Sequence, residues 1–226
     1  MKKYSTLLFD ADNTLLDFDF AEKQAVKKLC EKFNINYTEE HGKQYSVINQ
    51  ALWKQLEKGL ITRDVLKIRR FQQFAEYLGT DADPEKMADC YINALSECGK
   101  IIPGADELCL KLSRHYDMHI ITNGLAVVQK RRLAECGLLK YFSGYFISEE
   151  TGSQKPEKQF FDYVLSRIPE KDKSKICIIG DSLSSDILGG INSGIDTCFF
   201  SPSKQTDIPY QPTYQVADYK EITEIF

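Results

Sequence analysis

Two aspartates, Asp10 and Asp12, stand one residue apart directly after the apolar run Leu7–Phe9. Like charges this close repel each other, and the end of a buried strand gives them little contact with water. Chemistry on a phosphate ester has a use for both. The Asp10 carboxylate can attack phosphorus and form an aspartyl-phosphate. Asp12 can protonate the leaving oxygen and later accept a proton from water.

A divalent cation among these carboxylates would remove their repulsion. Mg²⁺ binds oxygen ligands and keeps several waters, so a few carboxylates are enough to hold it. The segment GDSLSSD supplies Asp181 after a second apolar run, and Asp186 five residues later. We therefore expect Mg²⁺ as cofactor, held by Asp10, Asp12, Asp181 and Asp186.

A transferred phosphoryl group also needs hydrogen-bond donors and positive charge around its oxygens. The segment TNG offers the Thr122 hydroxyl and the backbone N–H groups of Asn123 and Gly124. Lys155 precedes Pro156, which favours an extended conformation at Lys155 and can itself start a helix. We expect this lysine to provide a fixed positive charge for the phosphate and for the nucleophile.

Short apolar runs predict the strands that position these residues. They lie at 6–10, 118–123, 175–181 and 196–201, with a fifth candidate at 144–150. They do not alternate between apolar and polar residues, which is typical of parallel strands covered on both faces. Helix-like segments between the later runs indicate right-handed βαβ units. The carboxyl ends of such strands form the ligand crevice of an open sheet, so the polar residues after them should converge.

The strand signal stops at about residue 17 and returns after residue 97. Apolar residues in this interval recur at helical spacing, which predicts four helices. The fold class is therefore α/β, a Rossmann-like parallel sheet flanked by helices, with a small inserted all-helical cap domain. We assign 1–16 and 98–226 to the core and 17–97 to the cap. Cap side chains that could touch a substrate are Trp53, Lys54, Glu57, Lys58, Arg69 and Arg70, although the spacing of Trp53 favours a core position.

Composition restricts the classes of partner and compartment. The 226 residues carry a formal net charge of −4, so no global positive field favours a nucleic acid polymer or an anionic membrane. The seven cysteines are scattered without a C-x-x-C pair, which argues against a disulfide framework or a cysteine zinc site. The apolar run near the N-terminus is too short for a signal peptide. We expect a soluble cytoplasmic protein whose partner is a small-molecule phosphate ester; the sequence does not define its oligomeric state.

Each pattern is common by itself, and their order along the chain is the stronger signal. The segments DADNTL, TNG, KP and GDSLSSD resemble, in sequence order, the four motifs of the haloacid dehalogenase-like hydrolases. The resemblance spans nearly the whole chain and includes a helical cap inserted after the first motif. It implies that Asp10 is the nucleophile and Asp12 the acid/base, and that Thr122 and Lys155 hold the phosphoryl group. It also implies that Mg²⁺ is bound by Asp10, the Asp12 carbonyl and Asp181, with Asp186 in that shell or directly behind it.

One residue departs from the usual family pattern, because Asn13 stands where many members have glycine. Asparagine tolerates positive φ better than most residues, so the turn can be kept. The segment DADNTL, the cap segment LWKQLEKGLITRDVLKIRRF and the later segment SDILGGINSGIDTCF resemble most the bacterial pyrimidine 5′-nucleotidase branch. Those enzymes dephosphorylate nucleoside 5′-monophosphates.

Several alternatives stay open at this point. A sugar-phosphate phosphatase or a mutase of the same superfamily would use both aspartates. Dehalogenases and phosphonatase-like relatives resemble this chain but lack the second carboxylate. A phosphate-binding or partner-binding domain without turnover belongs to another class, and no altered motif favours it. The run KRRL at 130–133 lies on a helix whose expected buried face is Val127, Val128, Leu133 and Cys136, so its charges are predicted to be solvated.

Overall fold

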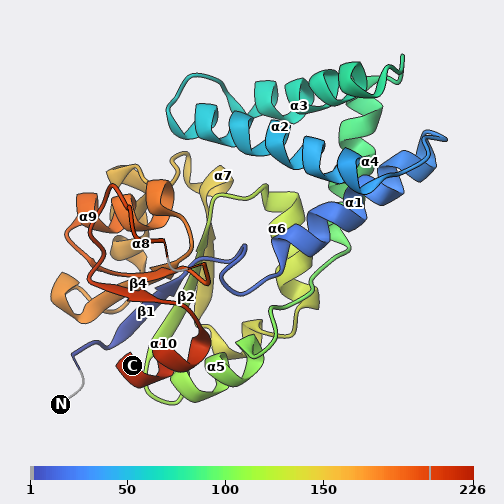
Figure 1. Cartoon of the computed structure of the whole chain (residues 1–226). Coiled ribbons are helices and arrows are strands. Elements are labelled where there is room, and N and C mark those ends of the chain that lie inside the picture. The colour runs from blue at the N-terminus through green and yellow to red at the C-terminus, as the bar shows by residue number, and fades with distance from the viewer. Residues whose placement is uncertain (1–2, 204) are drawn as a thin grey trace. The chain divides into compact units, whose positions relative to one another are not determined.

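The computed structural model describes residues 3–203 and 205–226 (Figure 1). Contacts along the chain divide it into two compact units. The core unit comprises the residues up to Asp17 together with Gly99–Phe226, and the helical unit comprises Phe18–Cys98. The division falls one residue after each of the two junctions expected from the sequence.

The core unit contains a sheet of six strands, all paired in parallel. Their order is β3-β2-β1-β4-β5-β6. The strands are β1 (Thr6–Phe9), β2 (Asp117–Thr122), β3 (Gly144–Ile147), β4 (Ile176–Gly180), β5 (Asp196–Phe200) and β6 (Tyr214–Val216). The predicted parallel sheet is confirmed, with its first five strands where the apolar runs placed them. The edge strand β6 was not predicted, because its three residues form no apolar run.

The strand order indicates which edge of the sheet carries the predicted site residues. The chain runs outward from β1 through β2 to β3, and then returns to β4 on the other side of β1. In register, Phe9 of β1 lies between Ile120 of β2 and Ile179 of β4. The crevice of such a sheet opens where the strand order reverses, at the carboxyl ends of β1 and β4. Asp10 and Asp181 directly follow those two ends.

Helices cover both faces of the sheet (Figure 1). On one face, Leu7 and Phe9 pack with apolar residues of α5 (Ala105–Leu112), α6 (Ala126–Glu135) and α10 (Tyr219–Ile225). On the other face, Leu8 packs with residues of α8 (Lys158–Arg167), and α9 (Leu188–Ser193) adjoins that helix. Because both faces are buried, apolar residues occupy successive strand positions, which explains the missing alternation.

Short helical turns complete the core unit. They are α7 (Ser148–Thr151), the 3₁₀ turns Leu139–Tyr141 and Lys173–Lys175, and the π-helical segment Leu183–Ile187 that leads into α9. A π-helical turn widens the backbone and is frequent at functional sites. This one carries Asp186.

The helical unit consists of α1 (Phe18–Lys32), α2 (Glu39–Glu57), α3 (Arg63–Leu78) and α4 (Pro84–Ser96). The starts of α2, α3 and α4 are capped by Thr38, Thr62 and Asp83, each of which accepts a hydrogen bond from a first-turn N–H. The four predicted helices are thus present. A cluster of buried aromatic rings joins α2, α3 and α4, namely Tyr45, Phe71, Phe74 and Tyr91.

Two side chains of the helical unit differ from expectation. Arg70, grouped with possible substrate contacts, is buried, and its Nη1 donates to Asn49 Oδ1 at 3.2 Å. Asn49 Nδ2 in turn donates to Glu22 Oε1 at 2.8 Å. Arg70 therefore belongs to an internal polar network of this unit. Trp53, expected in the core, is only partly buried.

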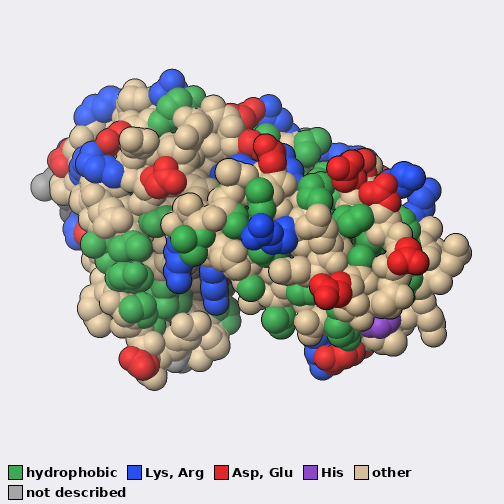
Figure 2. All heavy atoms as spheres, turned by 90° about the horizontal axis from the view of Figure 1, so that it is seen from above, with side chains coloured by type: hydrophobic (Ala, Val, Ile, Leu, Met, Phe, Trp, Pro, Cys, Tyr) green, Lys and Arg blue, Asp and Glu red, His purple; other side chains and the backbone are tan. Residues whose placement is uncertain are grey.

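The surface carries charges of both signs. Acidic and basic side chains are interspersed over the face seen in Figure 2. Across residues 3–203 and 205–226, no helix combines the length and the apolar character needed to cross a bilayer.

Candidate active site

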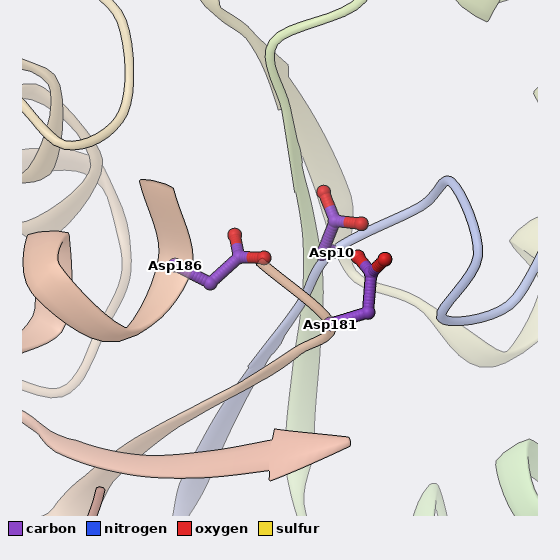
Figure 3. Close-up of side chains that lie close together, drawn as sticks. All are labelled: Asp10, Asp181 and Asp186. Atoms are coloured by element: carbon purple, nitrogen blue, oxygen red, sulfur yellow. The ribbon is translucent and has the colours of Figure 1, made fainter. Parts of the chain in front are cut away.

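Three carboxylates meet at the carboxyl edge of the sheet. Asp10 follows β1, Asp181 follows β4, and Asp186 comes from the π-helical segment; one oxygen of each lies within 4.8 Å of the others. Figure 3 shows the three side chains converging from these separate elements. Asp10 thus forms one acidic cluster with two aspartates from a distant part of the sequence, as expected for strand ends at a reversal of strand order.

The ammonium group of Lys155 lies directly against this cluster. Its Nζ donates to Asp10 Oδ1 at 2.5 Å, to Asp186 Oδ1 at 2.7 Å and to the carbonyl of Ile121 at 3.1 Å. A lysine has three N–H donors, so each of them has a partner here. The side chain is 1% exposed, and it is held there by charge pairing within a buried site.

The backbone of Lys155 is fixed by Asn123. The Asn123 side chain accepts a hydrogen bond from Lys155 N at 2.9 Å and donates to Lys155 O at 2.8 Å. Sequence reasoning predicted a role only for the backbone N–H of Asn123 at the site. The helix after this lysine also begins later than expected, because α8 starts at Lys158 with Glu157 at its N-cap, and Pro156 precedes it.

Asp186 is fully buried, and protein donors occupy both of its oxygens. Oδ1 accepts from Lys155, and Oδ2 accepts from the backbone N–H of Ser182 at 3.1 Å. The close approach needs a glycine at the end of β4, because a Cβ on Gly180 would lie 2.4 Å from Asp186 Cγ. Asp186 thus serves to hold Lys155 and the turn after β4 in place.

The acidic cluster has more negative charge than Lys155 can balance. Burial raises the pKa of Asp10 to about 7; the Lys155 charge lowers it, and the charges of Asp186 and Asp12 raise it. Burial, together with the charges of Asp10 and Asp186, also raises the pKa of Asp181 well above its ordinary value. The two neighbouring carboxylates hold the pKa of Lys155 above its ordinary value despite burial. A site with this charge balance favours an added cation.

Asp12 lies apart from the acidic cluster and is bound to α6. Its Oδ1 accepts from Arg132 Nη1 at 2.5 Å, and its Oδ2 accepts from Gln129 Nε2 at 2.9 Å. The loop that carries Asp12 turns at Asn13, whose φ is +56°. The expectation that asparagine can adopt positive φ at this position is confirmed.

Thr122 and Gly124 lie beside the same helix. Thr122 is buried, and its Oγ1 accepts from Gln129 Nε2 at 2.7 Å and from the backbone N–H of Gly124 at 3.1 Å. Gly124 leaves room for the glutamine, since a Cβ there would lie 2.6 Å from Gln129 Cγ. The structure therefore brings Thr122, Gly124 and Asp12 around one amide group.

The interpretation of KRRL as a solvated run is wrong for Arg132. Lys130 and Arg131 do lie on the outside of α6 and pair with Glu150 and Glu135. Arg132, however, is fully buried. Val127, expected on the buried face, is exposed. The helix is rotated so that its inner face carries Val128, Gln129, Arg132 and Leu133.

Sequence reasoning missed Gln129 and Arg132 as residues of the site. A signal was present, because residues three apart on a helix share a face and these two follow TNG closely. A run of three basic residues normally indicates a solvated surface, and that interpretation concealed the signal.

The chain is similar to known proteins over most of its length. Residues 4–194 match the haloacid dehalogenase-like hydrolase family. The chain is 38% identical to the pyrimidine 5′-nucleotidase PynA of Streptococcus pneumoniae, covering 98% of this chain and 94% of that protein. It is 34% identical to the pyrimidine 5′-nucleotidase YjjG of Escherichia coli, covering 99% and 98%.

A solved structure has a similar fold. The crystal structure of YfnB from Bacillus subtilis, bound to magnesium, superposes with a TM-score of 0.94 at 41% identity and covers 99% of each chain. That crystal form revealed interdomain movement in YfnB.

The chain belongs to the haloacid dehalogenase-like hydrolases. The fold class expected from the sequence is confirmed. The prediction that the protein is an enzyme of the phosphatase class is also confirmed.

Proposed function

We propose that this chain is a Mg²⁺-dependent phosphomonoesterase that acts on pyrimidine nucleoside 5′-monophosphates through an aspartyl-phosphate on Asp10. The observation that carries the proposal is the cluster of Asp10, Asp181 and Asp186 at the ends of β1 and β4, with the buried Lys155 bound to two of the three carboxylates. The substrate class is supported by the two nucleotidase relatives, which match almost the full length of this chain.

The donor set of the cluster fits a magnesium ion. It offers carboxylate oxygens alone, which a hard cation prefers, and Lys155 compensates only one of the three charges. Asp10 and Asp181 would hold the ion, together with the Asp12 carbonyl. Asp186 would stand behind them, because both of its oxygens accept hydrogen bonds from the protein. When bound, Mg²⁺ would neutralise charge on the phosphoryl oxygens and between the carboxylates.

The reaction would proceed in two displacements at phosphorus. In the first, an oxygen of Asp10 bonds to phosphorus while the bond from phosphorus to the ester oxygen breaks, and Asp12 gives its proton to that leaving oxygen. In the second, water attacks phosphorus, Asp12 takes the proton of the water, and the Asp10 carboxylate leaves. Lys155 and the Thr122 hydroxyl would bind the phosphoryl oxygens during both steps.

Removal of the metal provides the first test. We expect the protein to hydrolyse p-nitrophenyl phosphate with Mg²⁺ present, and to lose at least about 10²-fold in rate after treatment with EDTA. Activity should return when Mg²⁺ is added in excess of the chelator. Full activity in EDTA would contradict the assignment of Asp10 and Asp181 as metal ligands.

We further propose that the helical unit acts as a cap that selects the substrate. The core residues described above bind only the phosphoryl group and the cation. Every phosphate monoester carries the same phosphoryl group, so these residues do not distinguish one monoester from another. Discrimination must therefore come from other residues. Lys54 on α2 and Arg69 on α3 are exposed, whereas Arg70 is buried. The two exposed residues are candidates to contact a base or a ribose.

The substrate preference can be measured directly. We expect kcat/KM for uridine and thymidine monophosphates to exceed that for hexose phosphates by about 10²-fold. A difference of this size is expected when a hexose phosphate cannot form a few of the contacts that a nucleotide forms with the cap. Lys54→Ala or Arg69→Ala should lower this ratio of kcat/KM values. Lys43→Ala, which like Lys54 lies on α2, should leave the ratio unchanged. A preference for hexose phosphates in the wild type would reject the nucleotide assignment and leave the phosphatase chemistry intact.

A further inference from the structure

Helix α6 presents two buried polar side chains to the loop after β1. Gln129 and Arg132 are both 0% exposed and lie three residues apart on its inner face. Together they contact both oxygens of Asp12, whose side chain is 27% exposed. The carboxylate thus stands at the border of solvent while its partners are completely enclosed.

Arg132 has a strong physical reason to remain against Asp12. A guanidinium keeps its proton at any ordinary pH, and leaving a buried charge without compensation is strongly unfavourable. The Asp12 carboxylate contacts this guanidinium, and a hydrogen bond between two charged groups is stronger than a neutral one. Arg132 therefore holds one oxygen of Asp12 in place by charge pairing and a hydrogen bond.

Gln129 fixes the second oxygen and links it to the phosphate side of the site. Its Oε1 accepts from Arg132 Nη1 at 3.1 Å, which orients the amide so that Nε2 points to Asp12 Oδ2 and to Thr122 Oγ1. A single amide group thereby sets the distance between the carboxylate and the Thr122 hydroxyl.

We propose that Gln129 and Arg132 are positioning residues for Asp12, and that they hold its carboxylate in the orientation needed to exchange a proton with the ester oxygen and with water. The proposal rests on the proposed function, in which Asp12 is the acid/base. Asp12 stands on a loop, and the contacts with Gln129 and Arg132 restrict the rotation of its side chain. Helix α6 packs against the sheet and is therefore a more rigid support for Asp12 than its own loop.

The expected signature is a loss of kcat without a loss of substrate binding. Arg132→Met and Gln129→Met keep the length of each side chain and remove its donors. Each should lower kcat for uridine monophosphate by about 10- to 100-fold and change KM by less than about threefold, since neither residue is itself a proposed phosphate ligand and Lys155 is unchanged. Arg132→Lys should recover part of the loss. Arg131→Met is the matched control on the outer face of α6 and should behave as wild type.

A double-mutant cycle with Asp12→Asn separates positioning from a general effect on the fold. If α6 acts through Asp12, then Gln129→Met or Arg132→Met should change kcat by less than about twofold in the Asp12→Asn protein. The full 10- to 100-fold loss persisting in that background would overturn the proposal. A raised KM with unchanged kcat would also overturn it, because it would make Arg132 a substrate ligand.

The same measurements keep this inference apart from the proposed function. A wild-type protein that hydrolyses no phosphate monoester with Mg²⁺ would refute both. An active wild type whose Gln129→Met variant folds and retains full kcat would refute the positioning role alone. Thermal unfolding of each variant identifies any that fails to fold, and Gln129→Met, which introduces no unpaired buried charge, then decides the outcome.

Discussion

Asp10→Asn should abolish turnover while the protein stays folded. The amide keeps the shape of the side chain and still accepts a hydrogen bond from Lys155, but it is a far weaker nucleophile and metal ligand. We expect kcat to fall by about 10⁴-fold or more, as is typical when a covalent nucleophile is removed. Steady-state hydrolysis of uridine monophosphate, with a thermal unfolding curve as control for the fold, checks this result.

The size of the loss distinguishes Asp10 from an auxiliary residue. A matched control is Asp162→Asn, because Asp162 is a half-exposed carboxylate on α8 that pairs with Lys158. That variant should keep wild-type activity. If Asp10→Asn retained more than about a tenth of wild-type kcat, Asp10 would not be the nucleophile.

Lys155→Met should lower both stability and activity. It removes the cation that separates Asp10 from Asp186 and leaves two buried carboxylates facing each other. Breaking a buried pair in this way costs about 3–5 kcal/mol in the free energy of unfolding. Loss of a donor to the phosphoryl oxygens should also lower kcat by about 10²- to 10³-fold.

Urea unfolding without metal measures the first effect, and steady-state kinetics with saturating Mg²⁺ measures the second. Lys158→Met removes an exposed ion pair three residues further on and should cost less than about 1 kcal/mol. An unfolding free energy for Lys155→Met within that same limit would contradict the view that the ammonium group holds the cluster together.

Much of the fold was predictable because burial dictates composition. Strands covered on both faces must consist of apolar residues, and this is what made β1, β2, β4 and β5 visible. The edge strand β6 was not visible, because three residues with a polar centre give no periodic signal. Helix starts in the helical unit were marked by capping residues such as Thr38 and Asp83.

The site was predictable to the extent that it is local in sequence. Asp10, Lys155, Asp181 and Asp186 each occur in a short motif, and the topology brings them together without further information. The role of α6 depends instead on how the helix is rotated against the sheet, which is decided by packing. The rotation that buries Arg132 brings it against the Asp12 carboxylate, and no local pattern in the sequence records that partner.

Chemical trapping can detect the covalent intermediate on Asp10. Borohydride added during turnover of uridine monophosphate with Mg²⁺ reduces an acyl phosphate to an alcohol, and mass spectrometry of the digested protein locates the change. We predict reduction at Asp10, dependent on both substrate and Mg²⁺, and its absence when either is omitted. Sustained hydrolysis with Asp10 unmodified, or with the change at another aspartate, would show that Asp10 is not the nucleophile.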